Sequence, residues 1–287
     1  MRGVSSSGTF ILMQLLHTVS GLRARLTNEK SVVFVPTMGN LHEGHLELVR
    51  IARERGTCVV VSIFVNPLQF GPNEDFDKYP RTLGADCAKL QDLADVVFAP
   101  SVDEMYPEQQ TIFVEPPPIA NELCGAFRPG HFRGVATVVL KLFNLVQPQV
   151  AIFGKKDYQQ LAIIRQMVIQ LNLPIEIVGA ETSRAVDGLA LSSRNQYLSV
   201  SERTEAVFLS QTLRGMGDAL LKGGTGYVEL EEEAGAALAK RGWDLEYIAV
   251  RRQADLGMPA KGERCLVVLV AARLGGTRLI DNVEVCL

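Results

Sequence analysis

The chain has 287 residues, 47% of them hydrophobic and 21% charged, which is enough for one large globular domain or two moderate ones. Its 29 basic and 32 acidic residues give a net charge of −3, so no basic field favours binding to nucleic acid. Five cysteines without a Cys-x-x-Cys pair argue against a disulfide framework, and no apolar run approaches the ~18 residues of a membrane span. We expect a cytoplasmic protein that does not enter a membrane.

The N-terminal segment has a faint likeness to a signal peptide, because Arg2 precedes an apolar stretch at 10–16. Gln14 interrupts that stretch, it ends at His17, and no small-residue cleavage site follows. We therefore expect residues 1 to about 12 to be a dispensable extension, with Met13 as an alternative start.

Two histidines that follow a strand are the most informative feature. The apolar run 32–35 predicts a buried parallel strand, and Pro36 ends it. The sequence His42-Glu-Gly-His45 follows, and its apolar spacing predicts a helix over 45–55. Both imidazoles thus lie at a strand-to-helix turn, where free N–H groups and the helix dipole favour anions. Imidazoles placed there can stabilise the charge that develops on phosphate during phosphoryl or nucleotidyl transfer.

This histidine pair has two other interpretations. A zinc hydrolase needs His-Glu-x-x-His, which is one residue longer, and no third metal ligand is close in the sequence. Ordinary surface histidines are the second alternative. The chain has only 4 histidines, however, and His42, His45 and His131 all lie in glycine-containing loops beside predicted helix starts. His17 has no such context, and we assign it no function.

Strand and helix patterns alternate over the first two thirds of the chain. Repeated units of this kind predict an α/β fold with a doubly wound parallel sheet, whose ligands bind beyond the carboxyl ends of the strands. The predicted strands are 32–35, 58–65, 96–99, 111–114, 150–153 and 175–178, and the helices are 45–55, 82–93, 133–146 and 157–171.

The pattern changes near residue 185. Helices are predicted at about 201–221 and 227–240, followed by strands at 244–251, 265–272 and 277–284. Gly275-Gly276 is a hairpin-turn signal between the last two strands. We therefore predict a first domain over 1–184 and a second, smaller α+β domain over 185–287.

Two polar segments follow or precede predicted elements. Asn66 and Gln69 come after the second strand, where amides can hold hydroxyls and carboxylates without adding charge; a plain Asn- and Pro-containing turn is the alternative. Arg128, His131 and Arg133 precede a helix and suit an anionic group. A solvated loop with a capping role accounts for them equally well.

The fifth predicted strand leads into Gly154-Lys155-Lys156-Asp157. Glycine permits close approach of the backbone to a ligand, and a lysine can neutralise a phosphate. Asp157 is expected to cap the next helix, with a ribose hydroxyl as its alternative partner, and Gln160 lies one turn on. The spacing is that of neither a Walker A loop nor a Gly-x-Gly-x-x-Gly turn.

Ser192, Ser193 and Arg194 lie where the two predicted domains meet. Two hydroxyls beside an arginine can grip phosphate oxygens, and a loop at such a junction can close over a substrate. A simple linker is the alternative.

Together these segments resemble the pantothenate synthetases, or pantoate–β-alanine ligases. The resemblance runs from about Met13 through Arg203. It rests on five motifs in order, at 36–45, 64–71 with 79–82, 128–141, 153–161 and 187–198.

The resemblance implies a Rossmann-like nucleotidyltransferase domain, a small C-terminal domain and a homodimer. It also implies an AMP-forming reaction that uses ATP and Mg²⁺ to join pantoate to β-alanine through pantoyl adenylate. The ligands of Mg²⁺ are left unassigned. His42, His45, Lys156 and Arg194 would be the catalytic residues, with Gln69, Gln160 and Asn66 on the substrates. The residues expected to bind ATP are Met38, Gly39, Asn40, Leu41, His42, Glu43, Gly44, His45, Gly154, Lys155, Lys156, Asp157, Ser183, Leu191, Ser192, Ser193 and Arg194.

Two places depart from the family pattern. Glu181-Thr-Ser183 stands where the family often has a Pro- or Val-containing segment. Lys155 stands where glutamate is commoner, and we expect its charge beside Lys156 to tighten phosphate binding or to lower the pKa of Lys156. Two alternative functions remain: another adenylyl- or cytidylyltransferase with a phosphorylated substrate, and a nucleotide-binding module without catalysis. The second would not need so many polar motif residues.

Overall fold

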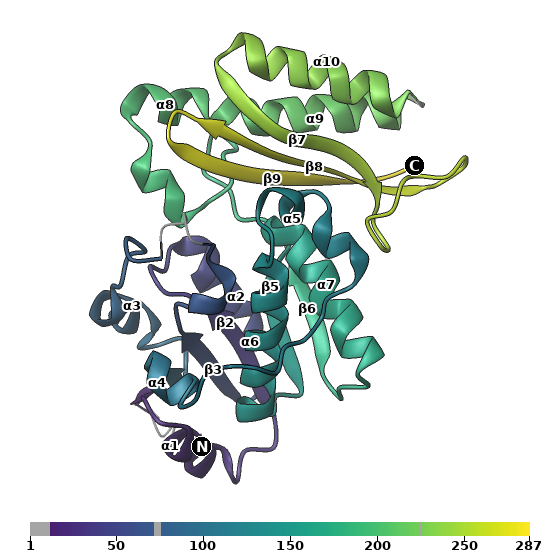
Figure 1. The fold of residues 1–287 in the computed structure, drawn as a ribbon. Coiled ribbons are helices and arrows are strands. Elements are labelled where there is room, and N and C mark those ends of the chain that lie inside the picture. Colours follow the sequence, from purple (N-terminus) through teal and green to yellow (C-terminus); the bar gives the residue numbers. More distant parts are fainter. Residues whose placement is uncertain (1–11, 72–75, 224–225) are drawn as a thin grey trace, which may run out of the picture.

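Six parallel strands form the centre of the larger domain in the computed structural model, which describes residues 12–71, 76–223 and 226–287. Their order is β1-β4-β3-β2-β5-β6 (Figure 1). The strands are β1 (Gln14–Leu16), β2 (Val32–Thr37), β3 (Cys58–Ile63), β4 (Val96–Phe98), β5 (Val150–Gly154) and β6 (Glu176–Ala180). The chain runs outward from β2 in one direction and from β5 in the other. The doubly wound parallel sheet is therefore confirmed, with its switch point between β2 and β5.

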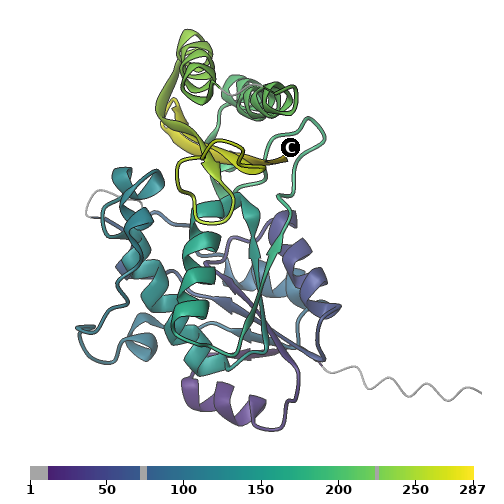
Figure 2. The same ribbon diagram turned by 90° about the vertical axis from the view of Figure 1, so that its right-hand side faces the viewer.

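Strand β2 shows why both faces of this sheet are covered. Val32 and Phe34 belong to the core on one face, whereas Val33 and Val35 belong to the core on the other, as the two-residue period of a strand requires. Figure 2 shows helices on both sides of the sheet. The first core receives side chains from α1 (Val19–Leu26), α6 (His131–Val146) and α7 (Tyr158–Gln170), and the second from α2 (Glu43–Arg53) and α3 (Leu83–Leu90).

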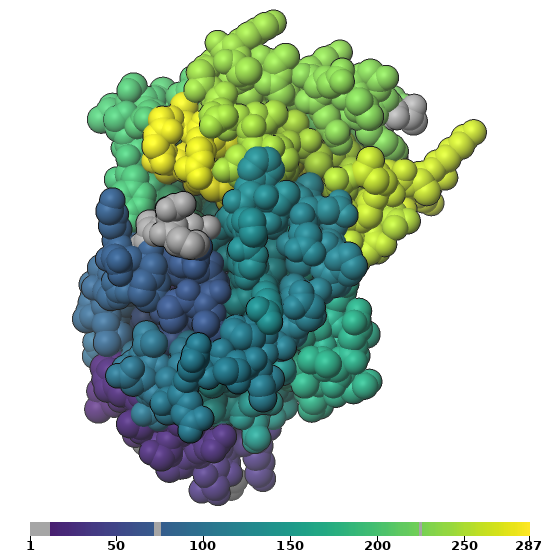
Figure 3. Space-filling model, in the orientation of Figure 1, coloured from purple at the N-terminus to yellow at the C-terminus, as the bar shows by residue number. Residues whose placement is uncertain are grey.

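The smaller domain is a three-stranded antiparallel sheet with helices on its outer face (Figure 1). Its elements are α8 (Val200–Glu205), α9 (Val207–Leu221), α10 (Tyr227–Lys240), β7 (Trp243–Arg252), β8 (Cys265–Leu274) and β9 (Thr277–Cys286). Gly275-Gly276 joins β8 to β9, which confirms the predicted turn. In Figure 3 this domain, green to yellow, is seated on the larger one.

Short helical segments complete the described fold. They are α4 (Val102–Met105), α5 (Cys124–Phe127) and the 3-10 turns η1 (Pro67–Gln69), η2 (Pro118–Asn121), η3 (Lys155–Asp157) and η4 (Ser193–Tyr197). Within residues 12–71, 76–223 and 226–287, no helix is both long and apolar enough to cross a membrane.

Three element predictions were wrong. Residues 111–114 do not join the sheet; Val114 donates its N–H to the Thr137 hydroxyl of α6 instead. The edge strand β1 was missed because it has only three residues and is largely exposed, so it carries no apolar period. The single helix expected over 201–221 is two helices, α8 and α9, which meet at Ala206.

Candidate active site

A cleft of about 1320 Å³, counting the part that opens to solvent, lies beyond the carboxyl ends of β2 and β5. This is the switch point, where ligands of doubly wound sheets bind. The polar side chains that line it are those of Thr37, His42, His45, Asn66, Gln69, Tyr79, Lys156, Asp157, Gln160, Glu181, Thr182, Ser183, Ser192, Ser193 and Arg194.

A buried carboxylate holds the turn between β2 and α2. Asp86 of α3 is fully buried and accepts the backbone N–H groups of Asn40 at 2.9 Å and Leu41 at 2.8 Å. These bonds stabilise a left-handed turn, with φ of +83° at Gly39 and +51° at Asn40. Sequence reasoning missed Asp86. The available signal was an acidic residue one turn before Leu90 on the inward face of a predicted helix.

The two histidines complete one another's helix cap. His42 is the N-cap of α2, and its Nδ1 accepts the N–H of Gly44 at 3.2 Å. The Nδ1 of His45 in turn accepts the backbone N–H of His42 at 3.3 Å. An accepting Nδ1 places the proton of a neutral imidazole on Nε2. Each ring therefore offers an Nε2–H donor in the cleft.

Burial keeps both rings neutral. Burial, together with a smaller contribution from the charge of Lys156, lowers the pKa of His42 from 6.5 to about 4. It likewise lowers the pKa of His45 to about 3, with contributions from His42 and Lys156. Lys156 thus acts on both rings, although it belongs to a segment far from them in the sequence.

Another part of the cleft lining is built around Gln69. Its Nε2 donates to the sulfur of Met38 at 3.1 Å, its Oε1 accepts from Asn66 at 3.1 Å, and its carbonyl oxygen lies 2.9 Å from Nδ1 of His131. For the segment around His131, an anion site and a solvated turn were the two interpretations. In the structure His131, the first residue of α6, contacts the backbone of Gln69.

Asn66 is almost entirely engaged within the protein. Its Nδ2 donates to Gln69 and to the carbonyl of Gly134 at 3.2 Å, and its Oδ1 accepts the Tyr106 hydroxyl at 2.8 Å. Only 1% of the residue is exposed. This geometry favours a role in holding Gln69 in place.

The turn after β5 differs from expectation in two ways. Asp157 makes no side-chain cap bond to α7, so the prediction of a capping role is wrong, and its carboxylate lines the cleft. The ammonium of Lys155 pairs with Glu181 and, at 2.6 Å, with Glu284. These two acidic partners explain why a lysine fits at this position. Hydrogen bonds to them outweigh the effect of burial and raise the pKa of Lys155. The expected extra positive charge beside Lys156 is therefore neutralised.

A hairpin brings the junction loop to the histidines. Leu191 donates its N–H to the carbonyl of Ser183 at 2.9 Å, which closes the hairpin. Beyond it, the Ser193 hydroxyl donates to the carbonyl of Asn40 at 3.2 Å, and the Ser192 hydroxyl accepts the N–H of Arg194 at 3.3 Å. The loop thus contacts the turn that carries the histidines.

Comparison with known proteins places this site in a family. A sequence model of the family "Pantoate-beta-alanine ligase" matches residues 14–284. The pantothenate synthetase of Methylobacillus flagellatus is 58% identical over 273 residues, which cover 95% of this chain and 98% of that one.

The chain belongs to the pantoate–beta-alanine ligase family.

Solved structures of two other family members have the same fold. The enzyme of Thermus thermophilus superposes with a TM-score of 0.91 at 47% identity, covering 96% of this chain and all of that one. The ligase of Francisella tularensis, in complex with beta-gamma ATP and beta-alanine, has a TM-score of 0.79 at 35% identity and covers 94% and 97%.

In this member of the pantoate–beta-alanine ligase family, most of the predicted site residues converge on one cleft. The exceptions do not line it, although each belongs to a segment that does. Leu41 is buried in the core, and Glu43 is exposed and paired with Arg50. The predicted residues outside the cleft lining are Gly39, Asn40, Leu41, Glu43 and Lys155.

Proposed function

We propose that this cleft carries out both halves of the family's ligation. In the first half, a pantoate carboxylate oxygen attacks the α-phosphorus of ATP, forming pantoyl adenylate and releasing pyrophosphate. In the second, the amine of β-alanine attacks the acyl carbon, loses a proton, and displaces AMP. The observation that supports this most directly is that the two neutral imidazoles line the same cleft as Lys156, Gln69 and Gln160.

The phosphate half of the site consists of His42, His45, Lys156 and Arg194. A free carboxylate is a poor acyl donor because oxide would have to leave, and adenylation replaces oxide with AMP. Negative charge builds on the phosphate oxygens during the attack, and preformed donors stabilise it. Neutral imidazoles donate through Nε2–H, while Lys156 and Arg194 supply positive charge. No covalent nucleophile is needed.

The substrate half consists of Gln69 and Gln160, whose amides suit the hydroxyl and carboxylate groups of pantoate. We place β-alanine beside Gln69. The Francisella tularensis ligase, 35% identical to this chain, was solved with beta-gamma ATP and beta-alanine together, which supports a shared cleft for both substrates. Asp157, which is not used as a cap, can take a ribose hydroxyl or contribute to cation binding.

Mg²⁺ fits the site as a companion of ATP. In the described part of the chain, no three potential metal-ligating side chains cluster. Mg²⁺ commonly keeps several waters and uses one or two carboxylates together with substrate phosphates, and Asp157 can provide such a carboxylate. The ion would neutralise phosphate charge; the protein residues orient the triphosphate around it.

The decisive test is pantoate-dependent exchange of labelled pyrophosphate into ATP, followed by measurement of AMP and pantothenate after β-alanine is added. We expect exchange without β-alanine and equimolar AMP and pantothenate with it. Exchange that required a phosphorylated substrate instead of pantoate would favour another nucleotidyltransferase. ATP binding without exchange would favour a non-catalytic module.

Three wider assignments belong to the same proposal. Residues 1–184 would bind ATP and pantoate, and 185–287 would carry the loop that closes on the triphosphate; residues 1–11 lie outside the described part. The five unpaired cysteines, all described, fit a reducing cytoplasm. The family resemblance supports a homodimer, which light scattering of the purified chain would test.

A further inference from the structure

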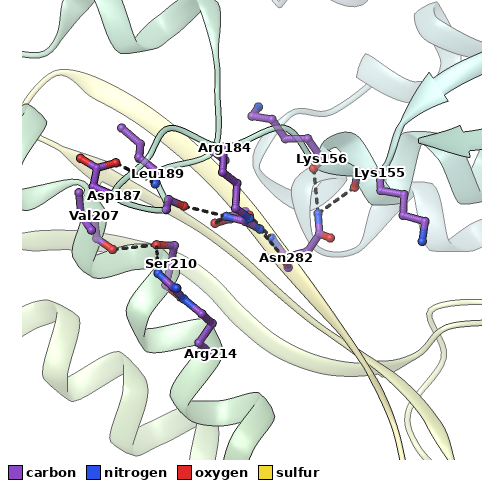
Figure 4. A network of polar contacts seen from close by, with 12 residues as sticks. Lys155, Lys156, Arg184, Asp187, Leu189, Val207, Ser210, Arg214 and Asn282 are labelled. Atoms are coloured by element: carbon purple, nitrogen blue, oxygen red, sulfur yellow. Dashed lines mark hydrogen bonds and ion pairs between the residues drawn. The ribbon is translucent and has the colours of Figure 1, made fainter. Parts of the chain in front are cut away.

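Two adjacent residues of the small domain hold both phosphate-binding segments of the large-domain cleft. Asp281 and Asn282 lie in the middle of β9, and both are buried, at 4% and 6% exposed. Figure 4 shows Asn282 between the backbone of Lys156 on one side and the side chain of Arg184 on the other. Neither residue belongs to a motif that sequence analysis singled out.

Asn282 clamps the turn that carries Lys156. Its Nδ2 donates to two consecutive carbonyl oxygens, those of Lys155 at 2.9 Å and Lys156 at 3.0 Å. Because one amide group binds two consecutive carbonyl oxygens, it fixes the orientation of the peptide unit between them. The two lysine side chains leave this turn in opposite directions (Figure 4), and that of Lys156 reaches the cleft. The clamp therefore fixes the backbone from which the Lys156 side chain extends into the cleft.

Asp281 holds the hairpin that leads to the junction loop. Its carboxylate accepts two bonds from Arg184, at 2.7 Å and 2.9 Å. Arg184 also donates to the carbonyls of Gly188 at 3.1 Å and Asn282 at 3.2 Å. The bidentate pair is a strong, directional contact. It fixes the hairpin from which residues 191–194 continue into the cleft.

We propose that Asn282 is a positioning residue for adenylate formation, acting through Lys156, and that Asp281 fixes the 191–194 loop relative to the same turn. This inference rests on the phosphate role of Lys156 proposed above. The physical reason is that catalytic groups on separate segments act together only when their spacing is fixed, and a displacement of about 1 Å can cost ~10²-fold in rate. The small domain supplies that fixed spacing.

The test is a double-mutant cycle of Asn282→Ala and Lys156→Ala, measured by pyrophosphate exchange. Because Asn282 acts through Lys156, we expect Asn282→Ala alone to lower the exchange rate roughly 10-fold or more. In the Lys156→Ala background, the same change should cost less than about 2-fold, a non-additivity typical of coupled residues. Losses that multiply would overturn the proposal.

A second readout separates positioning from general destabilisation. Reaction of preformed pantoyl adenylate with β-alanine involves no pyrophosphate, so Asn282→Ala should slow this half reaction far less than exchange. Equal slowing of both halves would contradict the proposal. Arg203→Ala is the matched control, because the bond that it breaks is an exposed ion pair with Asp187 of the same hairpin and not a bond to the Lys156 turn. It should leave both rates unchanged.

Two further outcomes are distinguishable. If Asn282→Ala does not fold, Asn282→Asp keeps the shape of the side chain while removing both N–H donors, and the same selective loss of exchange is expected. If Lys156→Ala itself retains normal exchange, the proposed function of Lys156 fails, whatever Asn282 does. Normal exchange in Asn282→Asp with a fully active wild-type protein would refute the positioning role alone.

Discussion

The imidazole rings of His42 and His45 lie 4.1 Å apart, centroid to centroid, and are held by one helix terminus. Each Nδ1 accepts a backbone N–H of that terminus, so the same bonds that cap α2 also choose the tautomer that faces the cleft. Capping and the proposed phosphate binding would therefore be two uses of one arrangement. A substitution here should change both activity and helix stability.

Replacement of His45 by alanine should show both effects. We expect adenylate formation to fall at least ~10²-fold, the usual loss for one transition-state donor. Loss of half the capping box should also lower the free energy of unfolding by about 1 kcal/mol. Pyrophosphate exchange and urea unfolding measure the two changes. Glu47→Ala, on the exposed face of the same helix, is the control, and near-normal exchange in the His45 variant would contradict its role.

The depressed histidine pKa values predict how stability depends on pH. Unfolding returns both rings from about 4 and about 3 to the ordinary 6.5. Between those values the unfolded state binds more protons, so stability rises with pH up to about 6.5 and falls on acidification below it. Carboxylates with lowered pKa, such as Glu205, lose their contribution only below their ordinary value of 4.5.

Urea unfolding at pH values of about 7.5, 6 and 5 tests this assignment, because these values bracket the range in which the unfolded histidines take up protons. We expect a clear loss of stability between the highest and the lowest pH in the wild-type protein. His42→Asn keeps a good capping side chain but does not titrate, so it should lose less over the same interval. An identical loss in that variant would show that other groups cause the dependence.

The two adjacent lysines should differ sharply in function. Lys156→Ala is expected to lower adenylate formation at least ~10²-fold, because it removes a charge from the phosphate site. Lys155 is paired with Glu181 and Glu284, so Lys155→Ala should change KM for ATP by less than ~3-fold; partly exposed ion pairs contribute about 0–1 kcal/mol. Steady-state kinetics on both variants decides this. Comparable losses would mean that the Lys155 ammonium reaches ATP.

Sequence reasoning located the cleft but not the residues that support it. Strand β2, the histidine pair and Lys156 were recognisable because apolar runs and polar motifs are local signals. Asp86 and Asn282 act on backbone groups 45 or more positions away, and such bonds leave no local pattern. The short edge strand β1 was not predicted for a related reason, because only its pairing with the distant strand β4 makes it a strand. Lys155 was misjudged because Glu284 is distant in sequence.

Asp86 should prove essential to the histidine turn. Asp86→Asn turns one of two accepting oxygens into a donor that faces a backbone N–H. Because bonds to charged groups contribute about 1.5–3 kcal/mol, we expect a loss of roughly 2 kcal/mol in stability. Pyrophosphate exchange should also fall. Asp92→Asn, exposed at the end of the same region, is the control and should match the wild type in urea unfolding and exchange. Unchanged exchange in Asp86→Asn would refute its support of the turn.

Gly134 is required by the close approach of α6 to the turn that carries Gln69. A Cβ at this position would lie 2.1 Å from the carbonyl oxygen of Leu68, a backbone atom that cannot rotate away. Gly134→Ala should therefore displace Gln69, lower stability by more than about 2 kcal/mol and raise KM for pantoate. Thermal unfolding and steady-state kinetics would measure both changes.

Gly215→Ala provides the matched comparison for that variant. Gly215 also lies within a helix, α9, but a Cβ there would meet nothing within 4 Å. Because alanine is favoured over glycine in helices by about 0.8–1 kcal/mol, this variant should be slightly more stable than the wild type and fully active. Equal destabilisation of both variants would contradict the argument that the contact with Leu68 makes Gly134 necessary. If Gly134→Ala kept a normal KM for pantoate, the contact between α6 and the Gln69 turn would not position the substrate.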